Sequence, residues 1–517
     1  MEGTIAAVST APGEGGIGII RMSGEKAEEI LAGLFVNSRS HNKRGAEERS
    51  TARDLFEGRR MRHGWIVDPV SNETIDEALC VVMRGPHSYT GEDVAEIQCH
   101  GGPVPLRRIL RACYALGAAP AEPGEFTKRA FLNGRMDLVQ AGAVIDLIGS
   151  RTELAYRAAR ELAEGKLSGK IREAREYLLA ALAEMAARID YPEAFDVHGS
   201  RGEPGGADGE AGGAAVEAFD VHGSRVEPGM TDGEPGMTDA LLRRASGILD
   251  GLIDGADRGK LLRDGLRACI IGKPNVGKSS LYNALLRADA AIVAAEPGTT
   301  RDTLETWLEL GGAAVALTDT AGIREDAGAV ERAGILRAKE AYARADVCLF
   351  VLDGSAPAGD EDLRIAGSLD GSKPTIIVVN KNDLPPVVSD EAASSLAPFA
   401  IGLVHTILAE PDEAGADAAD AADTGVSLIE ELLTGLVTEG RMPSEQYLLV
   451  TREAHKAALE DAAAEIREGC AALEAGEPPE LAEVTVREAY RILGEMIGEE
   501  VSDDVINRVF DGFCVGK

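Results

Sequence analysis

The feature that most constrains the fold is a glycine-rich segment, Gly272–Ser279, which reads Gly-Lys-Pro-Asn-Val-Gly-Lys-Ser. It follows the apolar run Arg267–Ile271 and precedes a sequence of helical character that starts near Ser280. A strand, a GxxxxGK[ST] loop and a helix in this order form a phosphate-binding loop, because the glycines let backbone N–H groups curl around phosphate oxygens. We therefore expect a doubly wound α/β domain over residues 265–437, with the Lys278 side chain reaching the β- and γ-phosphates.

Three further apolar runs follow this loop in the same region. Near-continuous apolar runs are typical of parallel strands that are buried on both faces. The sequence therefore predicts a parallel sheet covered by helices on both sides. The predicted strands are Arg267–Ile271, Ala314–Thr318, Val347–Leu352 and Thr375–Val379.

Two motifs at strand ends indicate which nucleotide binds. Asp319–Gly322 follows the second predicted strand, where the Asp can hold the shell of a magnesium ion and the Gly amide can bond the γ-phosphate. Asn380–Asp383 follows the last predicted strand, and the Asp383 carboxylate can accept hydrogen bonds from guanine N1–H and the 2-amino group. Alone, Asn380–Asp383 is interpreted equally well as a polar turn. In this order and spacing, the motifs indicate a GTPase.

The segment Gly298–Asp302 is predicted to be a switch that senses the γ-phosphate. Thr300 is expected to ligate Mg²⁺ together with Ser279, and only while the γ-phosphate is present. Ile323 stands where many GTPases carry a Gln that orients the attacking water, so hydrolysis requires another group. The predicted GTP-binding residues are Asn275, Val276, Gly277, Lys278, Ser279, Ser280, Thr299, Thr300, Asp319, Thr320, Ala321, Gly322, Asn380, Lys381 and Asp383.

The rest of the chain suggests a multidomain protein. Residues 1–120 mix short β-type runs with glycine-rich turns, which predicts an N-terminal α+β domain. Helical periodicity fills much of 121–264 and returns over 438–517. We therefore expect a discontinuous α-helical domain into which the P-loop α/β GTPase domain is inserted.

The sequence predicts neither a membrane-spanning protein nor a secreted, disulfide-linked one. No apolar run approaches the ~20 residues of a membrane helix, and the N-terminus lacks a secretory pattern. The chain has 7 cysteines, an odd number, and no CxxC pair. This pattern argues against a disulfide framework or a zinc ribbon and favours a reducing cytoplasm.

The net charge of −34 argues against a general nucleic-acid-binding surface. Much of the acidity lies in two insert-like segments, 193–239 and 410–424 with its flanks, so a local polyanion site stays possible. In the first insert, Glu193–Arg201 recurs as Glu217–Arg225. A disordered duplicated loop is favoured over a metal site at the repeated histidines, His198 and His222. The second insert is Ala/Asp-rich and is interpreted in the same way.

Several segments outside the GTPase motifs resemble one family. The nucleotide motifs are similar to those of the Era/EngA/TrmE group of GTPases. Four flanking segments look like the MnmE (TrmE) family of tRNA modification GTPases, and the resemblance covers almost the whole chain apart from the inserts. The segments are Ala11–Arg21, Ser88–Gly102, Pro123–Asn133 and Phe513–Lys517.

The resemblance implies a homodimer joined through the N-terminal domains and a partner, the FAD-dependent protein MnmG (GidA). Together they would modify carbon 5 of the wobble uridine in certain tRNAs, adding an aminomethyl or carboxymethylaminomethyl group. The one-carbon unit would come from 5-formyltetrahydrofolate or a related tetrahydrofolate. The implied folate-pocket residues are Arg21, Glu96, Arg135 and Lys517; the family commonly has Lys where this chain has Arg135.

The resemblance also implies activation by K⁺ and dimerisation of the GTPase domains. Asn275 and Thr299 match K⁺ ligands, whereas Ala294 and Glu296 replace a Thr and an apolar residue at two further positions. Glu331 matches the family's catalytic Glu, although read alone it is simply a charged residue near a helix start. A fifth motif, which contacts guanine in many GTPases, is reduced here to Ile407–Glu410.

Cys514 is open to two interpretations, a structural thiol or a catalytic thiol near the folate pocket, and its sequence context favours the second. His100 and His455 are interpreted as hydrogen-bonding scaffold residues rather than bases. Two alternative functions remain at this point. One is an RNA-binding or ribosome-assembly switch GTPase without modification chemistry. The other is a folate-handling enzyme with a regulatory GTPase domain.

Overall fold

The structure is a computed structural model with two compact units. One contains the described residues up to Gly149 and those from Val501 onward, and the other contains those from Ser150 to Glu499. The first unit extends to Gly149 because the helices α4 (Glu125–Leu132) and α5 (Leu138–Gly149) pack with the C-terminal segment. The structure describes residues 3–37, 56, 58–191, 236–288, 305–310, 312–319, 339–408, 416–438, 450–499, 501–510 and 513–516.

The N-terminal domain is a seven-stranded sheet in the order β3-β4-β5-β6-β2-β1-β7. All neighbouring strands are antiparallel except β1 and β7. Helices α1 (Ala27–Leu34) and α3 (Pro103–Ala115) cover one face, against which alternate strand residues such as Ile20 and Ile97 are fully buried. The strands are β1 (Ile5–Val8), β2 (Gly15–Ser23), β3 (Phe35–Asn37), β4 (Arg62–Val67), β5 (Thr74–Met83), β6 (Val94–Gly101) and β7 (Ala119–Pro120).

Helices α4 (Glu125–Leu132), α5 (Leu138–Gly149) and α18 (Asp503–Phe510) complete the first unit. Leu138 and Ala141 of α5 share a buried apolar cluster with Ile506, Phe510 and Phe513. The C-terminal residues are therefore held in the same unit as the sheet, although they lie far away in sequence.

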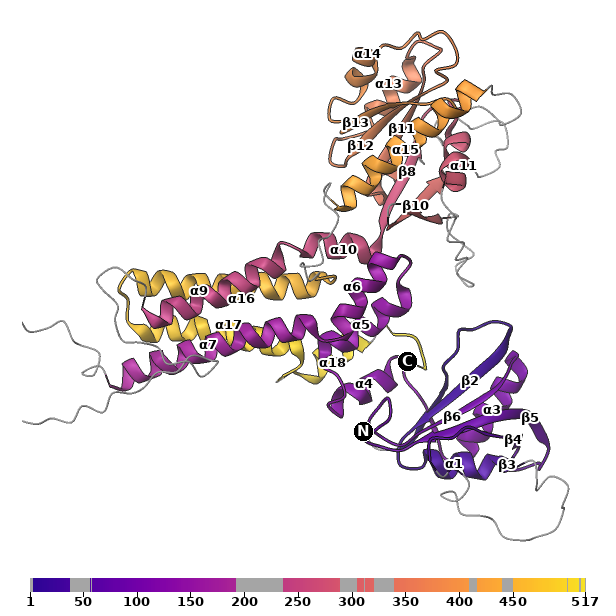
Figure 1. The fold of residues 1–517 in the computed structure, drawn as a ribbon, viewed down its shortest axis with the longest axis vertical. Helices are drawn as coiled ribbons and strands as arrows, with labels where there is room; N and C mark the ends of the chain where they lie inside the picture. The colour runs from indigo at the N-terminus through magenta and orange to yellow at the C-terminus, as the bar shows by residue number, and fades with distance from the viewer. Residues whose placement is uncertain are drawn as a thin grey trace, which may run out of the picture. The chain divides into compact units, whose positions relative to one another are not determined.

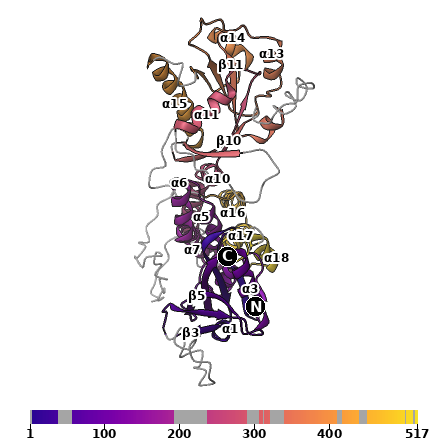
Figure 2. The same cartoon turned by 90° about the vertical axis from the view of Figure 1, so that its right-hand side faces the viewer.

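The second unit begins with a bundle of four long helices, which lie side by side in Figure 1 and Figure 2. Each helix contacts two others in the order α7-α9-α16-α17 around the bundle. On α7, the buried residues recur every three or four positions from Leu167 to Met185, which is the amphipathic pattern of a bundle helix. The helices are α7 (Lys166–Asp190), α9 (Met237–Ile253), α16 (Glu453–Glu474) and α17 (Pro479–Ile497).

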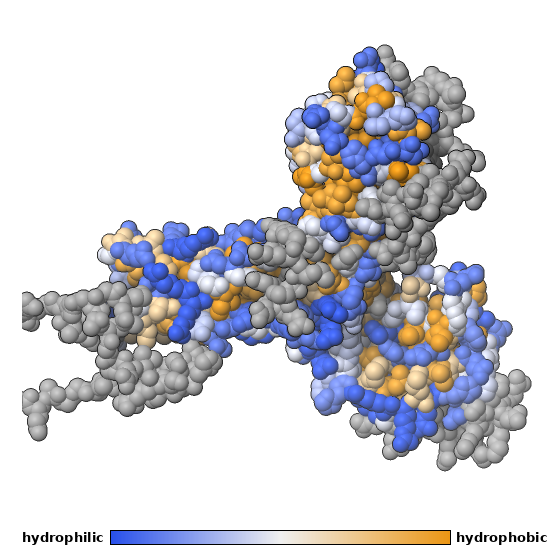
Figure 3. Space-filling model, turned by 45° about the horizontal axis from the view of Figure 1, so that its top comes forward, coloured by the Kyte–Doolittle hydropathy of each residue, from blue (hydrophilic) through white to orange (hydrophobic). Residues whose placement is uncertain are grey.

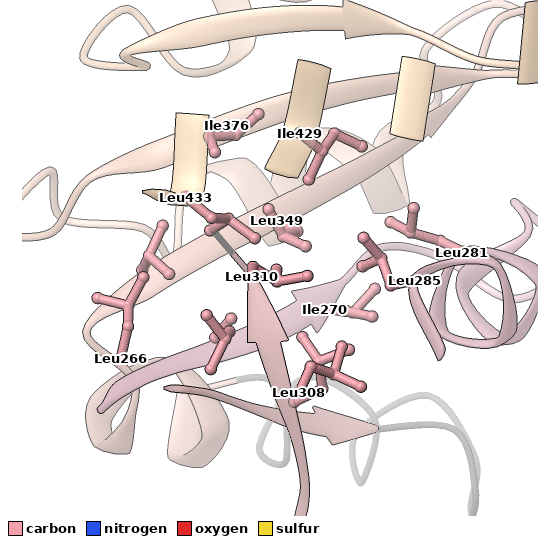
Figure 4. Close-up of a cluster of buried hydrophobic side chains, with 14 of the residues drawn as sticks. Leu266, Ile270, Leu281, Leu285, Leu308, Leu310, Leu349, Ile376, Ile429 and Leu433 are labelled. Atoms are coloured by element: carbon pink, nitrogen blue, oxygen red, sulfur yellow. The ribbon is translucent and has the colours of Figure 1, made fainter. Parts of the chain in front are cut away.

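The GTPase domain is a six-stranded sheet in the order β13-β12-β11-β8-β10-β9. All pairs are parallel except β10 and β9. Aliphatic side chains fill the core on one face of the sheet, as Figure 4 shows for ten labelled residues that include Ile270, Leu349 and Ile376. The strands are β8 (Leu266–Ile271), β9 (Glu305–Leu310), β10 (Ala313–Asp319), β11 (Val347–Asp353), β12 (Thr375–Asn380) and β13 (Gly402–His405).

The remaining helices cover this sheet or connect it to the bundle. Helices α6 (Glu153–Ala163) and α10 (Ala256–Asp264) contribute Ala158 and Leu262 to the GTPase core, so the bundle side and the sheet share one apolar cluster. The others are α11 (Lys278–Ala288), α13 (Asp360–Ala366), α14 (Asp390–Leu396) and α15 (Ala416–Thr438).

The predicted fold class is confirmed: an α+β domain, a discontinuous helical domain and an inserted α/β GTPase domain. One local expectation is wrong. Residues 416–424 of the second acidic insert form the first turns of α15 rather than a loose loop, since alanine is the best helix former and an amphipathic helix follows directly. The duplicated segment and its two histidines lie outside the described residues, apart from the start of α9.

None of the described helices combines the length and apolar character needed to cross a membrane. All seven cysteines lie within the described residues, and all are free. Among the described residues, no three His, Cys, Asp or Glu side chains gather in a way that could hold a metal ion.

Candidate functional site

The glycine-rich loop joins β8 to α11 at the carboxyl edge of the sheet. Asn275 has a positive φ of 65°, an uncommon conformation for a residue other than glycine. A Cβ at Gly272 would lie 2.4 Å from the Val351 carbonyl oxygen, and a Cβ at Gly277 would lie 2.1 Å from Asn380 Nδ2. The two glycines are therefore required because neighbouring strands approach the loop too closely for a side chain.

The loop lysine lies across the space that the loop encloses. Lys278 Nζ donates to the Lys273 carbonyl oxygen at 2.8 Å, and Lys273 Nζ in turn lies 2.9 Å from Asp362 Oδ2 on α13. Asp362 is buried, so this ion pair attaches the loop to the sheet's covering helix. A phosphate group would take over the Lys278 ammonium as its partner, since a charged acceptor forms the stronger hydrogen bond.

Asn380 connects the phosphate side of the site to the base side. Its buried Nδ2 donates to the Val276 carbonyl oxygen at 2.8 Å, and its Oδ1 accepts from the Leu408 N–H at 3.1 Å. The side chain thus links the glycine-rich loop, the end of β12 and the segment after β13. An Asn at this place was predicted to bind nucleotide, but the sequence did not show that its side chain makes these internal bonds.

The turn that carries Asp383 is held by its neighbour, Lys381. Lys381 has a positive φ of 67°, and its Nζ lies 2.7 Å from Asp353 Oδ2 at the end of β11. Burial raises the pKa of Asp353, but hydrogen bonds from Lys381 and Ser355 outweigh it and hold the pKa below its ordinary value. Asp383 itself is exposed, and among the described residues no group hydrogen-bonds its carboxylate. It is therefore available to a ligand.

The segment after β13 lies where a fifth guanine-contacting motif belongs. The Asn382 N–H donates to the Thr406 carbonyl oxygen at 3.4 Å, which brings Thr406 beside the Asn380–Asp383 turn. Thr406 Oγ1 is buried and, within the described part of the chain, has no hydrogen-bond partner. Sequence reasoning passed over Thr406 and Asp353. Asp353 ends the apolar run Val347–Leu352, which was its signal, whereas Thr406 follows a short strand, β13, that carries no such run.

The magnesium ligands can be tested only in part. Ser279 lies in the first turn of α11, and Asp319 ends β10 opposite Ile270, the penultimate residue of β8. Both residues therefore lie at the same edge of the sheet. The other predicted GTP, Mg²⁺, K⁺ and catalytic positions lie outside the described residues; they are Ala294, Glu296, Thr299, Thr300, Thr320, Ala321, Gly322 and Glu331.

A second polar site lies in the N-terminal domain. Arg21 on β2 and Glu96 on β6 are cross-strand neighbours, and Arg21 Nε lies 2.9 Å from Glu96 Oε1. The guanidinium also stacks near two rings, 5.5 Å from the centroid of Tyr89 and 5.9 Å from that of Phe126. The pair lies on the sheet face that α1 and α3 leave uncovered, because the flanking residues Ile20 and Ile97 point into the helix-covered core.

The C-terminal tail docks against the end of β1 and the segment that precedes α4. Val515 forms an antiparallel bridge with Pro123, and Ser9 Oγ donates to the Gly516 carbonyl oxygen at 3.0 Å. A Cβ at Gly516 would lie 2.1 Å from the Val8 carbonyl oxygen, so only glycine fits there. Cys514 is exposed and Lys517 lies outside the described residues. The exposure of Cys514 removes the main reason for interpreting it as a structural thiol.

Arg135 is the remaining described residue of the predicted folate set. It is exposed, and its backbone N–H donates to the Ala130 carbonyl oxygen at 2.8 Å. A Cβ at Gly91 would lie 3.4 Å from Arg135 Cγ, so this side chain packs against the Ser88–Gly102 segment. Within the described part of the chain, no hydrogen bond or ion pair joins Arg135 to Arg21 or Glu96.

Comparison with known proteins agrees with this arrangement. A family model described as "GTP-binding protein TrmE N-terminus" matches residues 4–135, and one described as "MnmE helical domain" matches residues 138–514. The second match alone spans more than half of the chain. The chain belongs to the MnmE family.

Curated members of the family match over their full length. Proteins named "tRNA modification GTPase MnmE" are 38% identical in Alkaliphilus oremlandii, 40% identical in Geobacter metallireducens and 39% identical in Moorella thermoacetica. Each match covers 100% of this chain and 100% of the relative. The resemblance to these relatives therefore extends over the whole chain.

His100 and His455, which the sequence predicts to be scaffold residues, lie in environments that suit a structural role. His100 Nδ1 lies 2.7 Å from Asp76 Oδ1, and this hydrogen bond raises the pKa of the exposed imidazole. Burial lowers the pKa of His455 to about 3, so its ring is neutral at physiological pH. A neutral, half-buried imidazole on a bundle helix is suited to packing rather than to catalysis.

Proposed function

We propose that this GTPase modifies carbon 5 of the wobble uridine in tRNAs, adding an aminomethyl or carboxymethylaminomethyl group. It would act as a homodimer in the cytoplasm with an FAD-dependent partner of the MnmG type. The observation that carries the proposal is the Arg21–Glu96 pair beside two aromatic rings and the docked C-terminal tail. A switch GTPase without modification chemistry has no use for such a site.

For the nucleotide site, the proposal assigns a task to each predicted residue, whether or not the structure describes it. Backbone N–H groups of the glycine-rich loop and Lys278 would hold the phosphates, and Asp383 would select guanine. Ser279 and Thr300 would hold Mg²⁺, which neutralises charge on the phosphates. Asn275 and Thr299, with positions Ala294 and Glu296, would surround K⁺, and Glu331 would orient the attacking water.

The N-terminal half of the proposal assigns a tetrahydrofolate to the uncovered sheet face. A pterin ring offers N–H donors to a carboxylate such as Glu96, and flat rings pack well against Tyr89 and Phe126. Arg21 and Arg135 would complement the carboxylates of the folate's glutamate tail. The docked tail brings the Cys514 thiol to the same unit, where we propose that it takes part in the uridine chemistry.

The same uncovered face supports the proposed homodimer. Figure 3 shows hydrophobic residues gathered on the visible side of the N-terminal domain. Ile17 and Leu79 are 65% and 41% exposed, and their neighbours Gly18 and Ala78 face α3 and the core. Exposed apolar residues on an uncovered sheet face are suited to contact with a second copy of the chain.

Analysis of tRNA nucleosides tests the proposed function. In a deletion strain, we expect mass spectrometry to show loss of the carbon-5-modified wobble uridine. The intact gene should restore it and Glu331→Ala should not, because this variant is expected to hydrolyse GTP roughly 10²-fold more slowly with GTP affinity nearly unchanged. Full modification in the deletion strain would exclude the proposal.

Binding of 5-formyltetrahydrofolate tests the N-terminal site directly. Arg21→Ala should weaken binding by about tenfold or more, since hydrogen bonds to charged groups contribute about 1.5–3 kcal/mol. Isothermal titration calorimetry measures this affinity, and GTP binding should be unaffected. Arg84→Ala is the matched control, because it removes another Arg–Glu pair, Arg84–Glu28, from the same domain. Equal weakening in both variants would contradict the assignment.

A further inference from the structure

The hairpin of β9 and β10 links the two nucleotide-sensing segments of the GTPase domain. β9 begins at Glu305, shortly after Gly298–Asp302, and β10 ends at Asp319, where the Asp-Thr-Ala-Gly motif starts. The hairpin is antiparallel and lies at the edge of the sheet, so only β10 attaches it to β8. A displacement at either motif therefore acts on the whole hairpin.

Trp307 on β9 is the point at which the hairpin meets the helical domain. The Arg151 guanidinium carbon lies 3.9 Å from the centroid of the Trp307 ring. This is close stacking, and the ring is only 9% exposed, so water screens the interaction weakly. Arg151 immediately precedes Thr152, whose side chain caps the N-terminus of α6 by accepting from the Ala155 N–H.

Two glycine positions show how closely the hairpin is held. Gly265 connects α10 to β8 with a φ of +75°, and a Cβ there would lie 2.5 Å from the Trp307 ring. A Cβ at Gly312, beside the hairpin turn, would lie 2.9 Å from Leu154 of α6. The ring therefore packs on the junction between α10 and β8, while α6 packs on the turn. Figures 1 and 2 both show α6 and α10 next to β10.

A hydrogen bond joins the same hairpin to the helix of the phosphate-binding loop. Tyr282 on α11 and Thr306 on β9 lie 2.6 Å apart, oxygen to oxygen. Thr306 is the residue before Trp307, so it points to the opposite face of β9. A series of direct contacts therefore joins α11 to α6. It passes through Thr306 and Trp307 of β9 and then through Arg151.

We propose that Arg151 is a positioning residue that couples the nucleotide state of the GTPase domain to the helical domain through its stack on Trp307. In GTPases, the γ-phosphate orders the two switch segments and its loss releases them. The hairpin carries this change to Trp307, and Arg151 passes it to α6. The effect on tRNA modification rests on the proposed function, whereas the nucleotide-dependent change at Trp307 does not.

Tryptophan fluorescence tests the first step, because the chain has only two tryptophans, Trp65 and Trp307. In the full-length Trp65→Phe protein, we expect Trp307 emission to differ between the GDP state and the GDP–aluminium fluoride state. The stacked guanidinium influences the emission of the ring, and we expect the nucleotide to alter this stack. Arg151→Ala should therefore abolish the difference, and Arg151→Lys should keep part of it. Emission that does not respond to the nucleotide, or a response that survives in Arg151→Ala, would overturn the proposal.

Modification assays with the partner protein and tRNA test the second step. In Arg151→Ala, modification per GTP hydrolysed should fall about tenfold, within the range of typical couplings between sites, while hydrolysis itself is retained. Arg157→Ala is the matched control, since its ion pair with Glu153 on the same helix is exposed. An unchanged ratio in Arg151→Ala overturns the coupling. Absence of modification by the unaltered protein would instead count against the proposed function.

Discussion

Asp383→Asn is expected to change nucleotide preference from GTP to XTP by on the order of 10³-fold or more, since a site built to hydrogen-bond one base rejects an analogue that leaves its groups unpaired. The carboxylate accepts from guanine N1–H and the 2-amino group. An amide at the same place can still accept from N1–H but donates to the carbonyl oxygen that xanthine has at carbon 2. Competition binding of GTP and XTP measures the change.

The structure explains why this substitution should change base selectivity without changing the fold of the turn. Asn380 and Lys381 hold the turn through Val276, Leu408 and Asp353, whereas the Asp383 carboxylate has no partner among the described residues. The fold therefore does not depend on its charge. Asp390→Asn is a matched control, because this Asp is also exposed in the GTPase domain and pairs only with His405 in the described contacts. Unchanged guanine preference in Asp383→Asn would contradict the assigned contact.

Local sequence predicted the parts of the molecule in which short segments determine their own structure. The glycine-rich loop, the strands before and after it and the Asn380–Asp383 turn are of this kind. Resemblance alone assigned Arg21 and Glu96 to a folate pocket, but it did not predict that they pair, which follows from the register of β2 and β6. The β-strand period of two then places both side chains on one face.

The sequence did not predict elements whose structure depends on distant partners. β9 has the sequence Glu-Thr-Trp-Leu-Glu-Leu, which mixes charged and apolar residues, and it pairs antiparallel with β10. It therefore differs from the continuous apolar runs of the parallel strands. β13 has only four residues. The bond from Asn380 to Val276 joins positions 104 residues apart, and no local pattern encodes such a contact.

The start of α15 was not predicted, because its composition and its packing favour different structures. The Ala/Asp-rich residues 416–424 have the composition of a loose segment, but they continue directly into an amphipathic helix whose Val426, Ile429 and Leu433 are buried against the sheet. Helix propagation adds one hydrogen bond per residue once a packed turn exists. The packed part of α15 therefore extends the helix backward into the acidic segment.

Gly277→Ala is expected to weaken nucleotide binding by about 10³-fold, because loss of two buried hydrogen bonds and the strain of a left-handed alanine together amount to several kcal/mol. At this position φ is +102°, and a Cβ would lie 2.1 Å from Asn380 Nδ2. The Asn380 side chain would have to leave the Val276 carbonyl and the Leu408 N–H. Titration with a fluorescent GDP analogue measures the affinity.

Gly476→Ala is a control for the general effect of an alanine with a positive φ on stability. Gly476 has a φ of +72° and lies after α16, and a Cβ there would meet nothing within 4 Å. It therefore introduces backbone strain without a clash and should leave nucleotide affinity unchanged while lowering thermal stability slightly. If Gly277→Ala bound nucleotide as well as Gly476→Ala does, the Asn380 side chain would not be the link between the phosphate and base sides. The rigidity of the site would then have to come from the glycine-rich loop alone.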